Sequence, residues 1–476
     1  MTSPTEIWQM TAAEQAAAIA AKDISCTEAA QASIDRMQAV NPDLNAVIDM
    51  MAEDALGRAR ILDQQPRDDY GPLRGITVTI KVNIDQEGHA TTNGVSAYRD
   101  MIAPDDAPLV RNLLKAGAVV IGRTNTPEFS FRADTDNPLH GRTHNPWGPH
   151  ISPGGSSGGA GAAVMAGIGA LAHGNDIGGS LRFPASANGA VTVKPGLGRV
   201  PAFNPSQKGE RGLLAQSMSV QGFLTRSAAD LDLAMPSLIA PDPRDPFHVP
   251  LPWRGPEMGA QLRIGFTKQM YGFDLHPEVD AALDAACDAL CDAGHDLVEL
   301  DIPDLRSCGE LGYRALMGEI SALLAPEIKA KGSDTIQQVF AGYFDRFPPL
   351  TGDDLLAAMA ARTTYARQWS LLLAETPLIV TPFQPNPFFA PDRDLDGAAG
   401  IVSTLGEAIW SYSMNFMGLP AGCVPARLAQ LPQGPQPINI QIVGQRWRED
   451  LITQACAQIE QRIGRMDRIL WDLMAA

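Results

Sequence analysis

Two glycine-flanked serine clusters contain the residues of this sequence best suited to covalent chemistry. The first is residues 154–159 (GGSSGG) and the second is residues 178–180 (GGS). Glycine next to serine permits backbone conformations that other residues avoid and lets a ligand approach the main chain. Serine is a weak nucleophile until a base activates it. We therefore interpret the clusters as a nucleophile and a hydroxyl relay, with backbone N–H groups free for an oxyanion.

A lysine within an apolar segment is the candidate base. Lys81 lies in residues 71–85 (GPLRGITVTIKVNID), whose β-branched and apolar composition predicts a buried strand. Burial of an ammonium without a partner is costly. Two interpretations follow from the strand alone. Lys81 is either an edge-strand lysine whose ammonium reaches solvent, or a desolvated lysine whose pKa is low enough for general-base catalysis.

The elements around these residues indicate the α/β class. A capping box at Ser25 and Glu28 predicts the start of a helix that runs to about Val40. Residues 110–116 have a helical pattern and residues 119–121 a strand pattern, and this alternation is typical of an α/β sheet. From about Pro241 the pattern changes to longer helical segments separated by proline-rich connections.

Composition and charge restrict the functional class. The chain has 476 residues, 45% of them hydrophobic, and a net charge of −17, which argues against nucleic acid or an anionic membrane as partner. The first 15 residues lack a secretory signal, and no apolar run is long enough to span a bilayer. The six cysteines are scattered, as is typical of reduced thiols. We expect a soluble cytoplasmic protein.

Taken together, Lys81, residues 152–159 (SPGGSSGG) and residues 174–185 (GNDIGGSLRFPA) resemble the amidase signature family of serine hydrolases. Members of that family have GGSSGGS-type loops followed by GTDxGGSIRxPA. The resemblance covers most of the chain and is weakest between about residues 241 and 382. It implies a central mixed twisted sheet covered by helices on both faces, with a helical, more variable insertion. Further matching segments are RTNTPEF (123–129), GLPA (418–421) and QIVG (441–444).

The resemblance implies a Ser-cisSer-Lys triad. Lys81 matches the catalytic lysine, Ser156 the bridging serine held by a cis peptide bond, and Ser180 the nucleophile. Ser180 would form an acyl-enzyme with an amide substrate and release a carboxylic acid and ammonia or an amine. No cofactor or metal is implied. The backbone N–H groups implied to hold the oxyanion are those of Ile177, Gly178, Gly179 and Ser180.

The resemblance also implies supporting residues. Asp176 and Ser157 would brace the two loops, and Arg182 is either a structural ion-pair partner or part of the site. Asn175 stands where the family motif commonly has threonine, and we expect this departure not to touch the Lys–Ser–Ser set. Residues in segments that line the acyl pocket of relatives suggest an apolar or aromatic acyl group, although ordinary core packing explains them equally well: Phe129, Phe131, Trp410, Tyr412 and Met414.

We divide the chain into four segments of one compact domain. Residues 1–70 are an N-terminal helical segment and residues 71–240 the amidase signature core. Residues 241–380 form a variable, largely helical region at the substrate entrance. Residues 381–476 complete the sheet.

Three alternatives compete with the amidase interpretation. The glutaminase subunit of a tRNA-dependent amidotransferase has the same triad and works with partner subunits, but residues 182–189 (RFPASANG) are more like free-standing amidases. Residues 155–159 satisfy G-x-S-x-G, yet no strand precedes them and no histidine follows His295. The Gly-rich loop also lacks the Gly-Lys-Ser/Thr end of a nucleotide-binding loop. A small-molecule amide is the expected partner, and a homodimer is left open.

Overall fold

One large mixed sheet organises the chain. The computed structural model describes residues 6–66 and 70–475, and its sheet has eleven strands in the order β1-β3-β2-β4-β6-β5-β10-β11-β9-β7-β8. The strands are β1 Val47–Met50, β2 Thr77–Lys81, β3 Val119–Thr124, β4 Leu171–Asp176, β5 Val191–Lys194, β6 Val220–Thr225, β7 Arg263–Phe266, β8 Asp296–Glu299, β9 Leu378–Pro382, β10 Ala421–Leu431 and β11 Gly434–Gly444.

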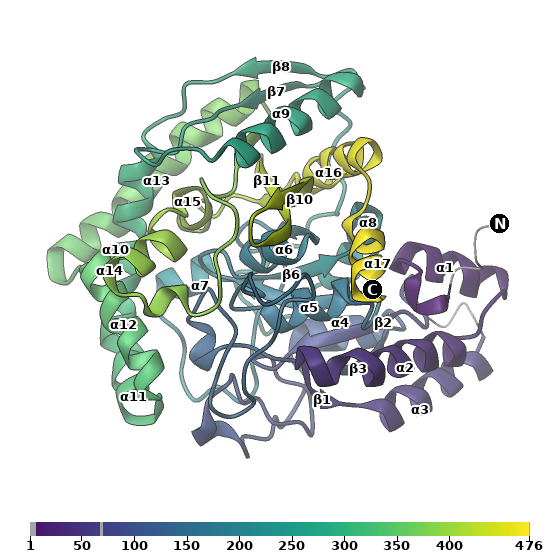
Figure 1. The fold of residues 1–476 in the computed structure, drawn as a ribbon. Helices are drawn as coiled ribbons and strands as arrows, with labels where there is room; N and C mark the ends of the chain where they lie inside the picture. The colour runs from purple at the N-terminus through teal and green to yellow at the C-terminus, as the bar shows by residue number, and fades with distance from the viewer. Residues whose placement is uncertain (1–5, 67–69, 476) are drawn as a thin grey trace.

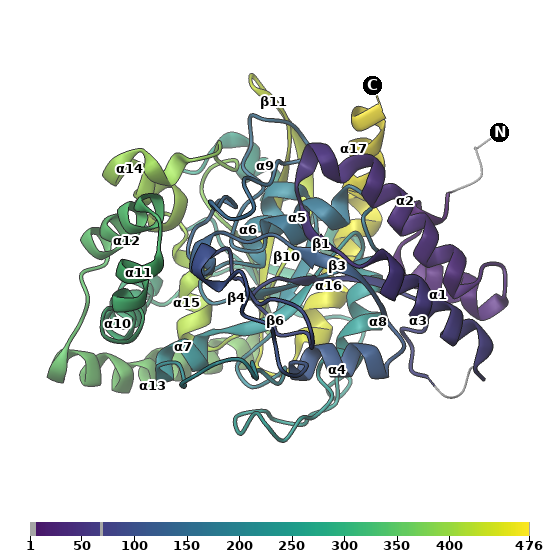
Figure 2. The ribbon, with the colours of Figure 1, turned by 90° about the horizontal axis from the view of Figure 1, so that it is seen from below.

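Helices from all parts of the chain surround this sheet. In both views the helices α10 to α13 lie at the opposite end of the molecule from α1, α2 and α3 (Figures 1 and 2). The helices are α1 Ala12–Ala21, α2 Cys26–Leu44, α3 Ala52–Gln64, α4 Pro108–Lys115, α5 Gly158–Met165, α6 Arg182–Asn188, α7 Leu213–Met218, α8 Ala228–Leu238, α9 Pro277–Asp292, α10 Leu305–Leu323, α11 Ala325–Lys331, α12 Asp334–Arg346, α13 Gly352–Glu375, α14 Gly397–Ile401, α15 Ile409–Met417, α16 Glu449–Ile463 and α17 Met466–Ala475.

The hydrophobic core lies on both faces of the sheet. Successive side chains of a strand point to opposite faces, and in β9 Ile379 belongs to one buried cluster while Leu378 and Val380 belong to another. The second cluster also contains residues of α4, α8, α9 and α16, whereas the first contains residues of α6, α10, α12 and α15. The expected α/β architecture, a mixed sheet with helices on both faces, is therefore confirmed.

Strand alternation decides where Lys81 points. In β2, Val78 and Ile80 belong to the cluster packed under α4 and α8. Lys81 and Thr77 therefore point to the other face, where the Thr77 hydroxyl lies 2.9 Å from the hydroxyl of Ser33 in α2. The sheet thus turns Lys81 toward the side on which α2 and α5 pack.

The capping box at the start of α2 is confirmed. The Ser25 hydroxyl accepts a 3.1 Å hydrogen bond from the Glu28 N–H, and the Glu28 carboxylate accepts a 2.7 Å bond from the Ser25 N–H. Each group satisfies an N–H that has no partner within the helix. The helix continues beyond the expected Val40 and ends at Leu44.

The sheet crosses all four sequence segments. The first segment was expected to be helical, but it also supplies the edge strand β1, which pairs antiparallel with β3. The third segment supplies β7 and β8, and β9 (Leu378–Pro382) spans its boundary with the fourth. Strand β10, which the sequence did not predict, bulges between Pro425 and Arg427, because proline cannot donate a ladder hydrogen bond.

Candidate active site

The candidate residues gather where parallel strands end. Strand β2 pairs parallel with both β3 and β4, so the carboxyl ends of all three strands meet at one edge of the sheet. Lys81 is the last residue of β2, Asp176 the last of β4 and Thr124 the last of β3. Ligand sites of open α/β sheets form in the crevice outside such strand ends.

Lys81 is completely buried and makes two side-chain hydrogen bonds. Its Nζ donates to Ser156 Oγ over 2.7 Å and to Asn175 Oδ1 over 2.8 Å. Burial holds the pKa of Lys81 well below its usual value of 10.5, and the carboxylate of Asp176 opposes that shift. Of the two interpretations of the strand, the structure therefore favours the desolvated lysine, since the side chain is 0% exposed.

Ser156 lies in a tightly packed loop before α5. The Gly155–Ser156 peptide bond is cis, as the resemblance implies. Thr126 Oγ1 donates a 2.8 Å hydrogen bond to the Ser156 carbonyl oxygen. At Gly155 an added Cβ would collide with the carbonyl oxygen of Arg132. Glycine is therefore required here, because the loop touches neighbouring main chain directly.

Ser180 lies in the turn between β4 and α6 and is half-buried. Its carbonyl oxygen accepts a 3.3 Å hydrogen bond from the Ser157 N–H, which ties the two serine loops together. Within residues 6–66 and 70–475 the Ser180 hydroxyl has no hydrogen-bond partner, so it is not bonded to Ser156 Oγ. Both serines line the same cavity. The structure thus brings Lys81 and Ser156 into contact and places Ser180 beside them with a free hydroxyl.

The four backbone amides predicted for the oxyanion are not equivalent. The Gly179 N–H donates a 2.7 Å hydrogen bond to Asp176 Oδ1, so this amide is already engaged and the expectation is corrected for Gly179. The amides of Ile177, Gly178 and Ser180 have no acceptor in the part of the chain that the structure describes. Three N–H groups of this turn therefore remain available to an oxyanion.

Arg182 and Asp176 form a buried ion pair beneath the turn. Arg182 Nε and Nη2 donate to the two carboxylate oxygens of Asp176 over 3.1 and 3.0 Å, and both side chains are fully buried. Burial by itself raises the pKa of Asp176, but Arg182 and Lys194 lower it to about 2. Arg182 also donates to the Ser411 carbonyl. Of the two roles left open for Arg182, the contacts favour the structural one.

Ser157 makes a weaker connection between the loops. Its hydroxyl lies 3.3 Å from both the carbonyl oxygen and the N–H of Asn175. Ser157 thus connects the two loops, whereas the Asp176 carboxylate bonds within its own turn, to the N–H groups of Gly179 and Leu181.

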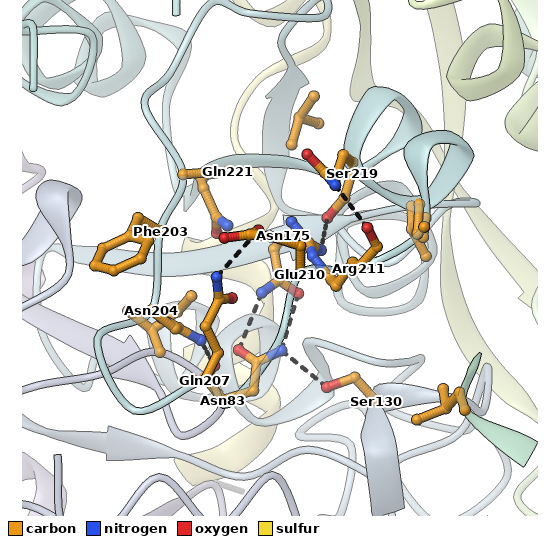
Figure 3. Close-up of a pocket in the computed structure, with 18 of the residues that line it drawn as sticks. Asn83, Ser130, Asn175, Phe203, Asn204, Gln207, Glu210, Arg211, Ser219 and Gln221 are labelled. Carbon is orange, nitrogen blue, oxygen red and sulfur yellow. Dashed lines mark hydrogen bonds between the residues drawn. The ribbon is translucent and has the colours of Figure 1, made fainter. Parts of the chain in front are cut away.

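A cavity of about 660 Å³ opens beside the two serines. Phe129 and Phe131 line it as predicted, whereas Trp410, Tyr412 and Met414 are fully buried in the core. The prediction is corrected for these three, because α15 packs against α10 and α13 and turns them into the core. Figure 3 shows polar side chains on the cavity wall, several of them joined by hydrogen bonds. The polar lining residues include Asn83, Ser130, Asn175, Asn204, Gln207, Arg211, Ser219 and Gln221.

A second, smaller hollow of about 30 Å³ also borders Ser180. It shares Phe131 and Ile177 with the larger cavity. The rest of its wall includes the aromatic and apolar side chains of Phe183, Tyr313, Tyr343 and Leu405, together with the buried Arg132. Ser180 therefore lies between a large, partly polar cavity and a small aromatic one.

A comparison with known families decides which family this site belongs to. A family model described as "Amidase" matches residues 28–453. The chain belongs to the amidase family.

Individual relatives agree with this membership. An indoleacetamide hydrolase of Bradyrhizobium diazoefficiens is 43% identical over 98% of this chain and 89% of its own length. One subunit of the glutamyl-tRNA(Gln) amidotransferase of Moorella thermoacetica is more distant, at 31% identity over 96% of this chain and 97% of its own. The solved structure of a 6-aminohexanoate cyclic dimer hydrolase with its substrate superposes with a TM-score of 0.82, at 28% identity, over 97% of this chain and 98% of that one.

The reaction class follows from these findings. This amidase-signature enzyme hydrolyses carboxylic amide C–N bonds in small, non-peptide molecules. None of the helices within residues 6–66 and 70–475 is long and apolar enough to cross a bilayer. In that same part of the chain, no group of three or more His, Cys, Asp or Glu side chains lies close enough to hold a metal ion.

One expectation about this amidase is wrong and one signal was missed. Asn175 was expected not to touch the Lys–Ser–Ser set, but it accepts a hydrogen bond from Lys81. Asn83 was not identified as a site residue, although it follows Lys81 by two positions in the same predicted strand. In the predicted strand of residues 71–85 a polar side chain two positions after Lys81 would share its face; the structure ends the strand at Lys81, and Asn83 reaches the cavity from the turn that follows.

Proposed function

We propose that Ser180 is the nucleophile, Ser156 the proton relay and Lys81 the general base of this amidase. The observation that carries the proposal is the 2.7 Å hydrogen bond between Lys81 Nζ and Ser156 Oγ, beside an accessible Ser180 on the same cavity. A lysine can act as a base only while it is neutral. Burial favours the neutral amine of Lys81.

Acylation begins with two linked proton transfers. The lone pair of neutral Lys81 takes the proton of the Ser156 hydroxyl, and Ser156 Oγ takes the proton of Ser180. Ser180 Oγ then attacks the substrate carbonyl carbon. The missing hydrogen bond between the two serines forms by rotation of the Ser180 hydroxyl, as catalytic hydrogen bonds often tighten only with substrate bound.

The tetrahedral oxyanion is held by the free amides of the Ser180 turn. The N–H groups of Ile177, Gly178 and Ser180 are its donors, and one such donor contributes about 3–4 kcal/mol. The proton then returns through Ser156 to the departing nitrogen. In deacylation the same relay takes a proton from a water molecule. The water oxygen attacks the acyl carbon, and the carboxylic acid leaves Ser180 Oγ.

We propose a primary amide with an aromatic acyl group as substrate. The 43% identical relative named indoleacetamide hydrolase supports this class. The rings of Phe129 and Phe131 on the wall of the larger cavity support it as well, because they offer aromatic surface beside Ser180. The cavity volume of about 660 Å³ lies within the usual range for small-molecule sites.

A panel of amides tests this proposal. We expect kcat/KM to be highest for indole-3-acetamide and phenylacetamide, lower for aliphatic amides and anilides, and lowest for a short peptide amide. Glutamine belongs in the panel because the more distant relative is part of an amidotransferase. A preference for glutamine, with a second protein chain that copurifies, would overturn the proposal. Ser180→Ala is the control for contaminating amidases.

We propose further that the enzyme acts in the cytoplasm and without nucleic acid, in agreement with its net charge of −17.

The homodimer stays a prediction. Light scattering coupled to size-exclusion chromatography measures the mass directly, and a monomer over the working concentration range would contradict the dimer.

A further inference from the structure

A chain of hydrogen bonds runs from Lys81 along the cavity wall. Lys81 Nζ donates to Asn175 Oδ1 over 2.8 Å, and Asn175 Nδ2 donates to Asn83 Oδ1 over 3.0 Å. Asn83 Nδ2 donates to Ser130 Oγ over 2.9 Å, and Ser130 Oγ donates to Asn93 Oδ1 over 2.6 Å. The central part of the chain is visible in Figure 3. The four residues that follow Lys81 along this series of hydrogen bonds all line the cavity: Asn175, Asn83, Ser130 and Asn93.

This chain fixes which way the Asn175 carboxamide faces. A carboxamide has an oxygen acceptor on one side and an NH₂ donor on the other. Because Asn83 Oδ1 takes an N–H of Asn175, the Asn175 oxygen is left facing Lys81. The reversed amide would place its NH₂ against the Lys81 Nζ and its oxygen against the Asn83 oxygen. Asn83 therefore orients Asn175, and Asn175 presents an acceptor to Lys81.

The far end of the chain is held by an unusual backbone. Phe129 and Ser130 are consecutive non-glycine residues with positive φ, +55° and +56°. Such conformations are unfavourable and persist where the surroundings enforce them, often at functional sites. The Phe129 N–H donates a 3.0 Å hydrogen bond to the Asn93 carbonyl oxygen, which anchors the turn. The turn places the Ser130 hydroxyl where it accepts the Asn83 hydrogen bond, and so holds the end of the chain farthest from Lys81.

Lys81 needs such an acceptor because its side chain is long and its surroundings offer few partners. The amino group can donate several hydrogen bonds, and its two side-chain acceptors are Ser156 and Asn175. The titratable groups near it on β4 are Asp176, which is paired with Arg182, and His173. Burial lowers the pKa of His173 to about 3, so this imidazole is neutral and its Nε2 lies 3.1 Å from Gln221 Oε1.

We infer that Asn175, oriented by Asn83, is a positioning residue that holds Lys81 Nζ against Ser156 Oγ. The inference rests on the proposed roles of Lys81, Ser156 and Ser180. It goes beyond them, because it assigns a role to a carboxamide at the position where the family motif commonly has threonine. Within residues 6–66 and 70–475 the Asn175 side chain makes no hydrogen bond to Ser156 or Ser180, so it acts on the two serines through Lys81.

The test compares Asn175→Leu with Asn175→Thr, using indole-3-acetamide as the probe. Leucine keeps the branched shape but removes the acceptor, whereas threonine restores an oxygen. We expect Asn175→Leu to lower kcat by about 10- to 100-fold with little change in KM, the loss typical of one hydrogen bond to an ionisable group. We expect Asn175→Thr to recover part of kcat. A carbonyl oxygen stabilises an ammonium more than an amine, so the acid limb of kcat/KM should move to lower pH in Asn175→Leu.

Two further variants separate positioning from a general structural defect. Asn83→Leu should lower kcat in the same direction, and the double variant should lose less than the product of the two single losses, because both residues act through one contact. Gln207→Leu removes another cavity carboxamide, bonded to Glu210, and should leave the acid limb in place. The inference is overturned if Asn175→Leu has the kcat and the pH profile of the wild type. It is also overturned if kcat falls while the acid limb of the kcat/KM profile stays at the wild-type pH.

Lys81→Ala distinguishes failure of this inference from failure of the proposed function. If Lys81→Ala keeps full activity, the proposed base is wrong and the inference falls with it. If Lys81→Ala is inactive while both Asn175 variants behave as wild type, only the positioning role is wrong.

Discussion

Lys81 and Ser156 are 75 positions apart in the chain, and their side chains meet over 2.7 Å in the buried end of the sheet. Lys81 is held by β2, which pairs with strands on both sides. Ser156 is held by a loop in which glycines contact neighbouring main chain. The pair is thus already in contact in the structure without substrate, and under the proposed mechanism this lowers the reorganisation needed for catalysis.

The first prediction concerns the nucleophile. Ser180→Ala should abolish hydrolysis of indole-3-acetamide, with a loss of at least about 10⁴-fold in kcat, as when other serine hydrolases lose their nucleophile. Mass spectrometry after mixing with an activated ester should show an acyl adduct on the wild type only. Ser217→Ala removes a hydroxyl on α7 that bonds to the Leu214 carbonyl, and is the matched control. An acyl adduct on the Ser180→Ala variant would contradict the assignment.

The second prediction is the pH dependence of kcat/KM. Because burial holds the pKa of Lys81 well below 10.5, the base loses its proton far below that pH. Activity should therefore rise as the pH rises through the lowered pKa, and then level off. Initial rates at substrate concentrations below KM, taken over a range of pH, measure this rise in kcat/KM. A rise that begins only near pH 10 would mean that Lys81 stays charged in the folded enzyme.

Removal of the base provides the matching third prediction. Lys81→Ala should fold normally, since alanine fits the buried strand, but should lose most of its activity. The loss should shrink as the pH is raised, because hydroxide replaces the missing base. Thermal unfolding monitored by circular dichroism checks the fold. A loss that stays constant between pH 7 and pH 10 would indicate a role for Lys81 other than proton transfer.

The fourth prediction concerns stability. Asp176→Asn leaves the Arg182 guanidinium buried without its counterion, which should lower the free energy of unfolding by about 3–5 kcal/mol near neutral pH. The pKa of Asp176 is about 2 in the folded protein and higher when unfolded. Its ionisation therefore contributes about 2 kcal/mol of stability above pH 4, lost as the pH falls toward 2. Urea unfolding at pH 6, 4 and 3 should show that the difference in free energy of unfolding between wild type and Asp176→Asn becomes smaller as the pH falls.

The fifth prediction concerns the aromatic hollow. Phe131 borders both cavities and stacks on Phe340 with ring centroids 4.3 Å apart. Phe131→Ala should raise KM for indole-3-acetamide by about tenfold, the equivalent of one aromatic contact, and change KM for propionamide little. Phe344→Ala removes the other ring that packs on Phe340, 5.8 Å away, and controls for lost packing. An equal change for both substrates would contradict an aromatic acyl site.

The sequence singled out the candidate reactive groups because their signals are local. Lys81 stands out as a charge in an apolar strand, and Ser156 and Ser180 as serines between glycines. The capping box of α2 was likewise readable, since both of its bonds lie within four residues. Strands β4 and β10 were missed because Gly174, Asn175 and Pro425 disguise their β patterns. Sheet pairing overrides such local preferences.

Contacts between distant segments decided the rest. Trp410, Tyr412 and Met414 have the composition of a pocket wall, but the packing of α15 against α10 buries them in the core. The Gly179 amide could serve an oxyanion, yet the Asp176 carboxylate three residues earlier accepts its hydrogen bond. Residue type does not reveal which way a side chain or an amide points, because that depends on what packs against it.

By itself the sequence indicated the reaction class and singled out Lys81, Ser156 and Ser180 as candidate reactive side chains, because a lysine in an apolar strand and glycine-flanked serines are recognisable from their immediate neighbours. The tertiary structure alone decided that Asn175 and Asn83 reach Lys81, that three backbone amides stay free, and that an aromatic hollow adjoins Ser180. These features depend on parallel strands ending at the same edge of one sheet. The meeting of these strand ends brings together residues that are far apart in the chain, and no local sequence pattern indicates it.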